Sequence, residues 1–112
     1  MNPMDTLLVL CNCPDATVAE TLARRVLDLR LAACVNLLAP CRSLYRWEGA
    51  IESAEEVPLL IKTSADRYPA LQAALQQAHP YTVPEIIALP VSAGLPAYLH
   101  WVAAETRPQG EA

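Results

Sequence analysis

The sequence predicts an α+β domain in which one antiparallel sheet carries two long helices on the same face. Three observations predict it. Short apolar runs and segments of helical period follow one another in the order strand, helix, strand, strand, helix, strand; the two middle strands form a long hairpin; and a short helix comes last. The 112 residues suffice for one domain. We expect it to span residues 1–112, with an ordered core from about 6 to 106.

The first strand and the first helix are separated by a change of period. Residues 6–11 contain a continuous apolar run that ends at Pro14, as is typical of a strand covered on both faces. From Thr17 onward, apolar residues recur at helical spacing with charged residues between them. This helix can begin at Asp15, which would accept backbone N–H groups, or at Thr17 in a capping box with Glu20.

A long hairpin follows, with arms at residues 33–48 and 51–63 that are rich in alternating β-branched and aromatic residues. Pro40 and Pro58 lack the N–H group that a ladder needs, so we expect bulges or an edge position there. Such an arm spans about 45–50 Å at about 3.3 Å per residue, whereas a domain of this length has a radius of gyration of about 13 Å. The hairpin must therefore extend beyond the body, and another copy of the chain is its simplest cover.

The second half of the chain supplies the remaining helices and one strand. A helix over residues 64–78 tolerates Pro69 in its first turn and ends at His79. Residues 85–91 follow Pro84, include Pro90 and are too few for a helix, which predicts a strand. A short helix is expected after Gly94, and residues 107–112 are expected to form a loose tail. These elements in this order predict the ferredoxin-like, split β-α-β fold.

Composition and charge exclude some classes of function. A formal net charge of -4 disfavours contact with nucleic-acid phosphates. No apolar run reaches the roughly 18 residues of a membrane span, and residues 1–5 lack the start of a signal peptide. We therefore expect a cytoplasmic protein with neither a nucleic-acid nor a membrane partner. The apolar share of 54% is high for so small a domain and favours a homo-oligomer.

The four cysteines are expected to be reduced, because nothing indicates secretion. Cys11 and Cys13 lie two apart in an extended segment, so their side chains point the same way and could hold a soft ion such as Cu(I) or Zn. Two small buried side chains are the plainer explanation. Cys34 and Cys41 are interpreted as structural. His79 is either a cation favourable to the helix dipole or a metal ligand.

Other candidate residues lie on the hairpin. Tyr45 and Trp47 share one face of the sheet, where they could pack at an interface or bind a ligand. Lys62 could bind an anion, although a lone surface lysine usually carries no function. The sequence has no Gly-rich phosphate loop, no H-E-x-x-H and no Ser-His-Asp pattern, so we expect neither an enzyme nor an organic cofactor.

Several strings together resemble a known family. The most specific are S-x-Y-x-W-x-G at residues 43–49 and H-P-Y-x-x-P-E at residues 79–85. With the stretches 31–36, 61–63 and 98–101, they are similar to the CutA divalent-cation tolerance family from about residue 8 to residue 102. The resemblance implies a ferredoxin-like homotrimer in which the hairpins of three subunits wrap together, an architecture similar to that of the nitrogen-regulatory PII proteins.

The resemblance also implies a function and a metal site. The family is associated with copper and other divalent ions, through a cysteine that ends the first strand and histidines just before Pro-Tyr. Cys11 and His79 match these positions. Ala78 stands where some relatives carry a second histidine, so a site here has one ligand fewer unless Cys13 completes it. The implied function is a trimeric metal-binding protein in the response to metal ions.

Three alternatives use the same kind of fold. A PII-like signalling module would bind a small molecule or anion in clefts between subunits, with Lys62, Tyr81 and Glu85 as candidate residues. An acylphosphatase-type enzyme needs an arginine in the loop after the first strand, and residues 12–15 contain none. A copper chaperone uses C-x-x-C in that loop, whereas the spacing here is C-x-C.

Overall fold

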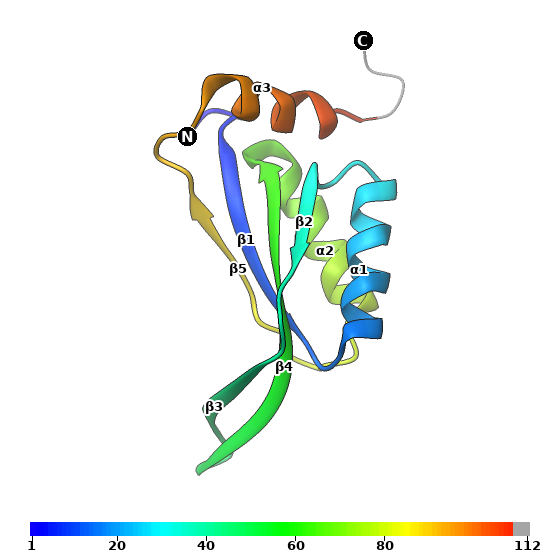
Figure 1. Ribbon diagram of the computed structural model, residues 1–112, viewed down its shortest axis with the longest axis vertical. Coiled ribbons are helices and arrows are strands. Elements are labelled where there is room, and N and C mark those ends of the chain that lie inside the picture. The colour runs from blue at the N-terminus through cyan, green and yellow to red at the C-terminus, as the bar shows by residue number, and fades with distance from the viewer. Residues whose placement is uncertain (109–112) are drawn as a thin grey trace.

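The computed structural model describes residues 1–108 and confirms the predicted α+β fold with an antiparallel sheet (Figure 1). Its elements are β1 (Thr6–Cys13), α1 (Ala16–Asp28), β2 (Cys34–Leu37), β3 (Cys41–Trp47), β4 (Ala50–Ser64), a short 3-10 helix η1 (Ala65–Arg67), α2 (Tyr68–Ala78), β5 (Ile86–Pro90) and α3 (Pro96–Glu105). Within residues 1–108, no helix is both long and apolar enough to cross a membrane.

The sheet has the strand order β2-β4-β1-β5, and β3 pairs with the far part of β4. All pairs are antiparallel, and β1 lies in the centre between β4 and β5. Helices α1 and α2 lie on one side of the sheet, while α3 runs across its end opposite the hairpin (Figure 1). This is the strand order of the predicted split β-α-β arrangement.

The two faces of the sheet differ in what covers them. Alternate residues of β1 are buried with α1 and α2 in the core, as strand geometry requires: Leu7, Val9, Cys11 and Cys13. The residues between them, Leu8, Leu10 and Asn12, are on the other face, which we call the open face. Leu10 lies opposite Ile87 and Leu8 opposite Leu89, and both β5 residues are exposed. Between β1 and β5 the open face is therefore apolar, and its β5 residues have no cover in the single chain.

The hairpin differs from the sequence-based prediction in its first arm. Instead of one strand, β2 and β3 are separated by residues 38–40, because Pro40 has no N–H for the ladder. The N–H of Leu38 still bonds to the Pro58 carbonyl oxygen at 3.0 Å, which keeps the arms together. The turn has positive φ at Glu48 (49°) and Gly49 (81°), the geometry of a two-residue type I′ turn.

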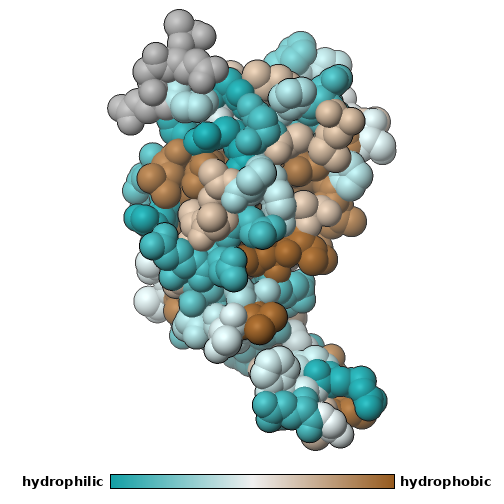
Figure 2. All heavy atoms as spheres, turned by 180° about the vertical axis from the view of Figure 1, so that it is seen from behind, coloured by the Kyte–Doolittle hydropathy of each residue, from teal (hydrophilic) through white to brown (hydrophobic). Residues whose placement is uncertain are grey.

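The predicted overhang of the hairpin is confirmed. The molecule measures 49 × 27 × 23 Å. In Figure 2 the hairpin end leaves the body as a narrow arm on which hydrophobic and hydrophilic surface adjoin. Leu44, Trp47 and Ile51 are exposed on it. The apolar part of this arm has no cover within the described chain.

Specific contacts decide two predictions, one about where α1 begins and one about the C-terminal tail. Asp15 begins α1, since its carboxylate accepts the Val18 N–H at 2.8 Å, whereas Thr17 makes no such cap. The expected loose tail is wrong at Arg107, which forms an ion pair with Asp66 at 2.7 Å and donates to the Ser64 hydroxyl. Residues 109–112 of that tail lie outside the described residues.

Candidate functional site

Three side chains of the types that can ligate a metal ion converge where β1 ends. Cys11 and Cys13 project from β1 towards the helices, and His79 directly follows the last residue of α2. One ligand atom from each lies within 4.8 Å of the other two, and all three residues are buried. The structure thus brings together the three residues that the sequence analysis selected as metal ligands.

His79 is held by both of its ring nitrogens. Nδ1 accepts the backbone N–H of Tyr81 at 3.1 Å, so Nε2 carries the proton and donates to the carbonyl oxygen of Asn12 at 2.7 Å. The residue is only 7% exposed, so both hydrogen bonds are largely shielded from water. A metal ion could reach the Nδ1 lone pair only if the Tyr81 N–H were released.

The two thiols share one hydrogen bond. Cys11 donates to Cys13, and this bond, burial and the negative charges of Glu85 and Glu56 raise the pKa of Cys11 above that of a free thiol. Accepting the same bond lowers the pKa of Cys13. Cys13 is therefore the thiol that ionises first, and Cys11 the one that keeps its proton longer.

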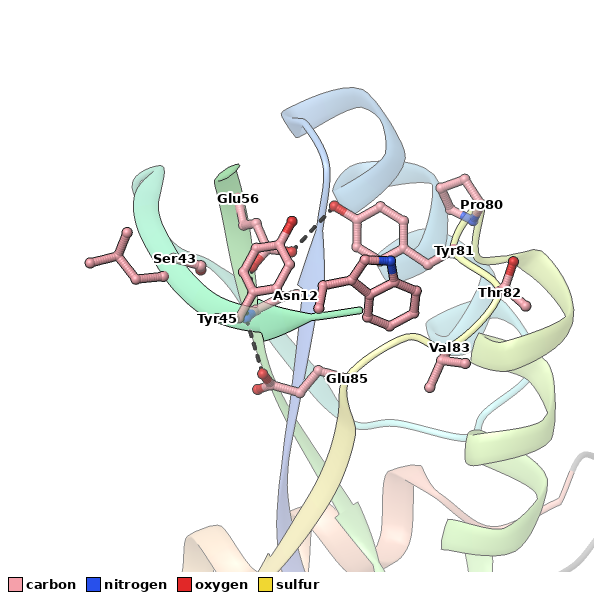
Figure 3. Close-up of a pocket in the computed structure, with 11 residues that line it drawn as sticks. Asn12, Ser43, Tyr45, Glu56, Pro80, Tyr81, Thr82, Val83 and Glu85 are labelled. Atoms are coloured by element: carbon pink, nitrogen blue, oxygen red, sulfur yellow. Dashed lines mark hydrogen bonds between the residues drawn. The ribbon is translucent and has the colours of Figure 1, made fainter. Parts of the chain in front are cut away.

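A cavity lies on the open face, on the other side of β1 from these ligands. Its volume is about 680 Å³, and it is formed between the hairpin and the loop before β5 (Figure 3). The residues that line it are Asn12, Ser43, Leu44, Tyr45, Trp47, Glu56, Pro80, Tyr81, Thr82, Val83 and Glu85. Because Asn12 stands between two cysteines on a strand, its side chain points away from them and into this cavity.

Hydrogen bonds order the polar side of the cavity. The Tyr81 hydroxyl donates to Glu56 Oε2 at 3.2 Å. The Asn12 amide donates to Glu56 Oε1 at 3.4 Å and to Glu85 Oε1 at 3.3 Å, and it lies between the two glutamates in Figure 3. Burial, followed by the charge of Glu56, raises the pKa of Tyr81 to about 12. The phenol therefore stays protonated at neutral pH and acts as a donor.

The structure divides the other predicted cleft residues into two groups. Tyr45, Trp47, Tyr81 and Glu85 line the cavity, but Lys62 does not. Lys62 lies in the middle of the open face, where it pairs with β1 and β2 neighbours.

The surroundings of Lys62 also bear on two cysteines. The Lys62 ammonium is 3.8 Å from Cys34 Sγ and hydrogen-bonds to the Asn36 side-chain oxygen. Cys34 is half buried and Cys41 is exposed, so neither lies in the hydrophobic core. All four cysteines are free.

Sequence reasoning missed Asn12 and Glu56 as site residues. Asn12 could have been found from its position between two cysteines that point into the core. Glu56 could be found only once the pairing of β4 with β1 was known, because Pro58 lies opposite Asn12 and Glu56 shares the face of Pro58.

Comparison with known proteins identifies the family. The family described as CutA1 divalent ion tolerance protein matches residues 7–105. The divalent-cation tolerance protein CutA of Pectobacterium atrosepticum is 48% identical over 103 residues, which are 92% of this chain and 94% of that protein. Protein CutA of Mus musculus is 51% identical over 90 residues, which are 80% of this chain and 51% of the mouse protein.

Solved structures agree with the sequence match. CutA from the bacterium Xylella fastidiosa has a TM-score of 0.90 and 46% identity, covering 92% of this chain and 99% of that chain. A protein from Archaeoglobus fulgidus, described as a periplasmic divalent cation tolerance protein CutA, has a TM-score of 0.88 and 33% identity, covering 91% and 99%. The chain therefore belongs to the CutA1 divalent ion tolerance family, a family of tolerance proteins and not of enzymes.

Proposed function

We propose that this divalent-cation tolerance protein binds copper, or another divalent metal ion with a preference for soft ligands, and acts in the response to metal ions. The observation that carries the proposal is the convergence of Cys11, Cys13 and His79 within 4.8 Å of one another. Thiolate and imidazole ligands favour copper and zinc, whereas Mg²⁺ and Ca²⁺ require oxygen ligands. Cys13 supplies a third donor where Ala78 leaves the second histidine of some relatives absent.

The ligand residues have different tasks in this proposal. Cys13 ionises first and offers the first thiolate, while Cys11 must lose the proton that it donates to Cys13. His79 offers Nδ1 once the Tyr81 N–H has turned away, and its Nε2 bond to Asn12 then orients the ring. Because metal binding releases protons from the thiols, affinity should fall as the pH falls.

Calorimetric titration with copper under reducing conditions tests the metal site. Cys11→Ser, Cys13→Ser and His79→Ala should each weaken copper binding by about tenfold or more, because even changes beyond the ligands cost about 10–100-fold. Cys41→Ser, at an exposed cysteine on the hairpin, is the matched control and should bind like the wild type. Wild-type affinity in the double variant Cys11→Ser/His79→Ala would place the copper elsewhere.

We also propose that the protein is a homotrimer. Two apolar surfaces support this: the open face with Ile87 and Leu89, and the hairpin arm with Leu44 and Ile51, all exposed in the single chain. Three mutually wrapped hairpins would cover both surfaces at once. Light scattering at micromolar concentration should give three times the monomer mass, and a monomer mass would refute the proposal.

A cytoplasmic location is proposed on chemical grounds. All four cysteines are free, as expected in a reducing compartment. Cell fractionation with compartment markers checks this, and recovery with periplasmic markers would contradict it.

A second candidate function is a PII-like module that binds a small molecule near the subunit contacts. The cavity of about 680 Å³ beside Asn12 favours it, since its volume is typical of small-molecule sites. A ligand screen followed by protein NMR tests it, and shifts confined to Cys11, Cys13 and His79 would argue for the metal function alone.

A further inference from the structure

We infer that the cavity beside Asn12 binds a small organic cation, an alkyl ammonium or diamine, between the carboxylates of Glu56 and Glu85 and against the rings of Tyr45, Trp47 and Tyr81. The inference narrows the second candidate function to one class of ligand. The metal ligands lie on the other face of the sheet, although the backbones of Asn12 and Tyr81 bond to His79 while their side chains line the cavity.

The first argument is uncompensated negative charge. Within residues 1–108, neither Glu56 nor Glu85 forms an ion pair, and their partners are the neutral amide of Asn12 and hydroxyl of Tyr81. Glu56 is only 9% exposed, so its carboxylate has lost most of its water. A buried charge is costly unless an opposite charge or several hydrogen bonds compensate it, and a bound cation would complete the compensation.

The second argument is how the hairpin distributes its charges. Residues directly opposite in an antiparallel ladder share a face, so Glu52 lies on the face of Tyr45. Glu56 lies four residues further along β4 and therefore on the same face. The arginines of β3, Arg42 and Arg46, alternate with Tyr45 and therefore lie on the other face. Neither arginine lines the cavity, nor does any lysine. The charged side chains on the cavity side of the hairpin are thus all carboxylates.

The third argument is the aromatic content. Tyr45, Trp47 and Tyr81 line the same space as the two carboxylates. In Figure 3, Tyr45 on the hairpin and Tyr81 on the loop flank Asn12, and the hydroxyl of Tyr81 faces Glu56. Aromatic faces attract ammonium ions within about 6 Å, and desolvated sites gain most from this contact.

The volume of the cavity and the side chains that line it argue against a single metal ion or an anion as the occupant. A volume of about 680 Å³ is that of an organic molecule and not of one metal ion. Only two carboxylates converge here, whereas Ca²⁺ needs about six to eight oxygen ligands. An anion would meet the two glutamates without any cationic partner among the lining residues. An organic ammonium ion is the class of ligand that would neutralise the carboxylates, contact the aromatic rings and fit the volume of the cavity.

The test compares three probes of equal chain length: the diamine cadaverine, the corresponding diol and the dicarboxylate glutarate. Binding to the assembled protein is followed by the fluorescence of Trp47 in a Trp101→Phe background, with a chelator present so that metal binding does not contribute. Trp101 lies on α3 against Tyr98 and does not line the cavity. Cadaverine should bind, the diol more weakly, and glutarate not at all.

Matched variants assign the signal to the cavity. Glu56→Gln should weaken cadaverine binding by about tenfold, because charged hydrogen bonds at buried positions are the stronger ones. Glu85→Gln, at an exposed position that cannot threaten folding, should weaken it by about threefold. Glu55→Gln, on the opposite face of β4, should leave it unchanged.

Four results would overturn the inference: no cadaverine binding, as when a neighbouring copy fills the cavity; equal binding of the diol; preference for glutarate; or equal losses in the Glu55 and Glu85 variants. None of these bears on copper binding, which the thiol variants test separately.

Discussion

The two halves of β4 have the same extended backbone and very different surroundings. From Val57 to Thr63, alternate side chains are fully buried between the sheet and the helices. From Ala50 to Glu55 the side chains are mostly exposed, and Ile51 reaches 73%. Alternation of residue types is thus enough to form the strand, but it does not reveal what stabilises each half. Residues 57–63 are stabilised by the chain's own core, whereas residues 50–55 have no such cover in the described chain.

Both candidate sites lie near the junction of these halves. Glu56, the first buried residue of β4 after the arm, faces the cavity, and Val57 next to it lies opposite Cys13 of the candidate metal site. The inner site is made of buried, hydrogen-bonded groups from the body. The outer site combines body residues with the arm. Substitutions in the two halves should therefore act on different equilibria.

The largest contrast is expected between two isoleucines of β4. Ile61→Ala removes a fully buried side chain and should lower the free energy of unfolding by about 2–5 kcal/mol. Ile51→Ala should instead weaken the association of copies and barely change unfolding of the separated chain. Urea unfolding checks the first effect, and light scattering over a dilution series checks the second. Equal unfolding costs would erase the distinction between the two halves.

The next effect concerns the aromatic arm. Trp47 is 49% exposed in the single chain, and a charge there should weaken assembly by about 2 kcal/mol or more, as for interface hot spots. We therefore expect Trp47→Glu to shift the protein towards monomers while its circular dichroism stays that of a folded body. Light scattering gives the mass, and an unchanged oligomer would place Trp47 outside the interface.

A smaller effect separates the two histidines. His79→Ala leaves the Tyr81 N–H and the Asn12 carbonyl without a partner and should cost about 1–3 kcal/mol in unfolding free energy. His100→Ala, on the exposed side of α3, should change stability by less than about 0.5 kcal/mol. Thermal unfolding of both variants at one pH and protein concentration compares them, and equal midpoints would argue against the buried hydrogen bonds.

The smallest effect is expected at the other end of the body. Arg107 lowers the pKa of Asp66, so their pair stabilises the fold above the ordinary aspartate pKa of about 3.9, and this stabilisation is lost as the pH falls through the lower folded-state pKa. Asp66→Asn should remove at most about 1 kcal/mol at neutral pH, because the pair is partly solvated.

Acid unfolding of the Asp66→Asn variant should accordingly be less steep than that of the wild type. Glu20→Gln, which breaks the exposed Arg24 pair on α1, is the control and should change little. Identical acid profiles for the wild type and the Asp66 variant would show that the pair contributes nothing.

The sequence by itself determined the order of elements, the overhang and the direction of several side chains. Periods of 2 and 3.6 residues are local properties, and turn residues such as Gly49 act within a few positions. For the same reason Cys11 and Cys13 could be placed on one side of β1. The break at Pro40 was foreseen as an irregularity but not as two separate strands, since its extent depends on how Leu38 bonds across to Pro58.

The tertiary structure alone decided which distant groups meet. His79 reaches the carbonyl of Asn12 across 67 residues of sequence because α2 ends beside the end of β1. The register between β1 and β4 brings Glu56 to Asn12 and leaves Lys62 in the middle of the open face. Such encounters depend on the packing of whole elements and on a register in which a shift of one residue would turn every side chain to the opposite face.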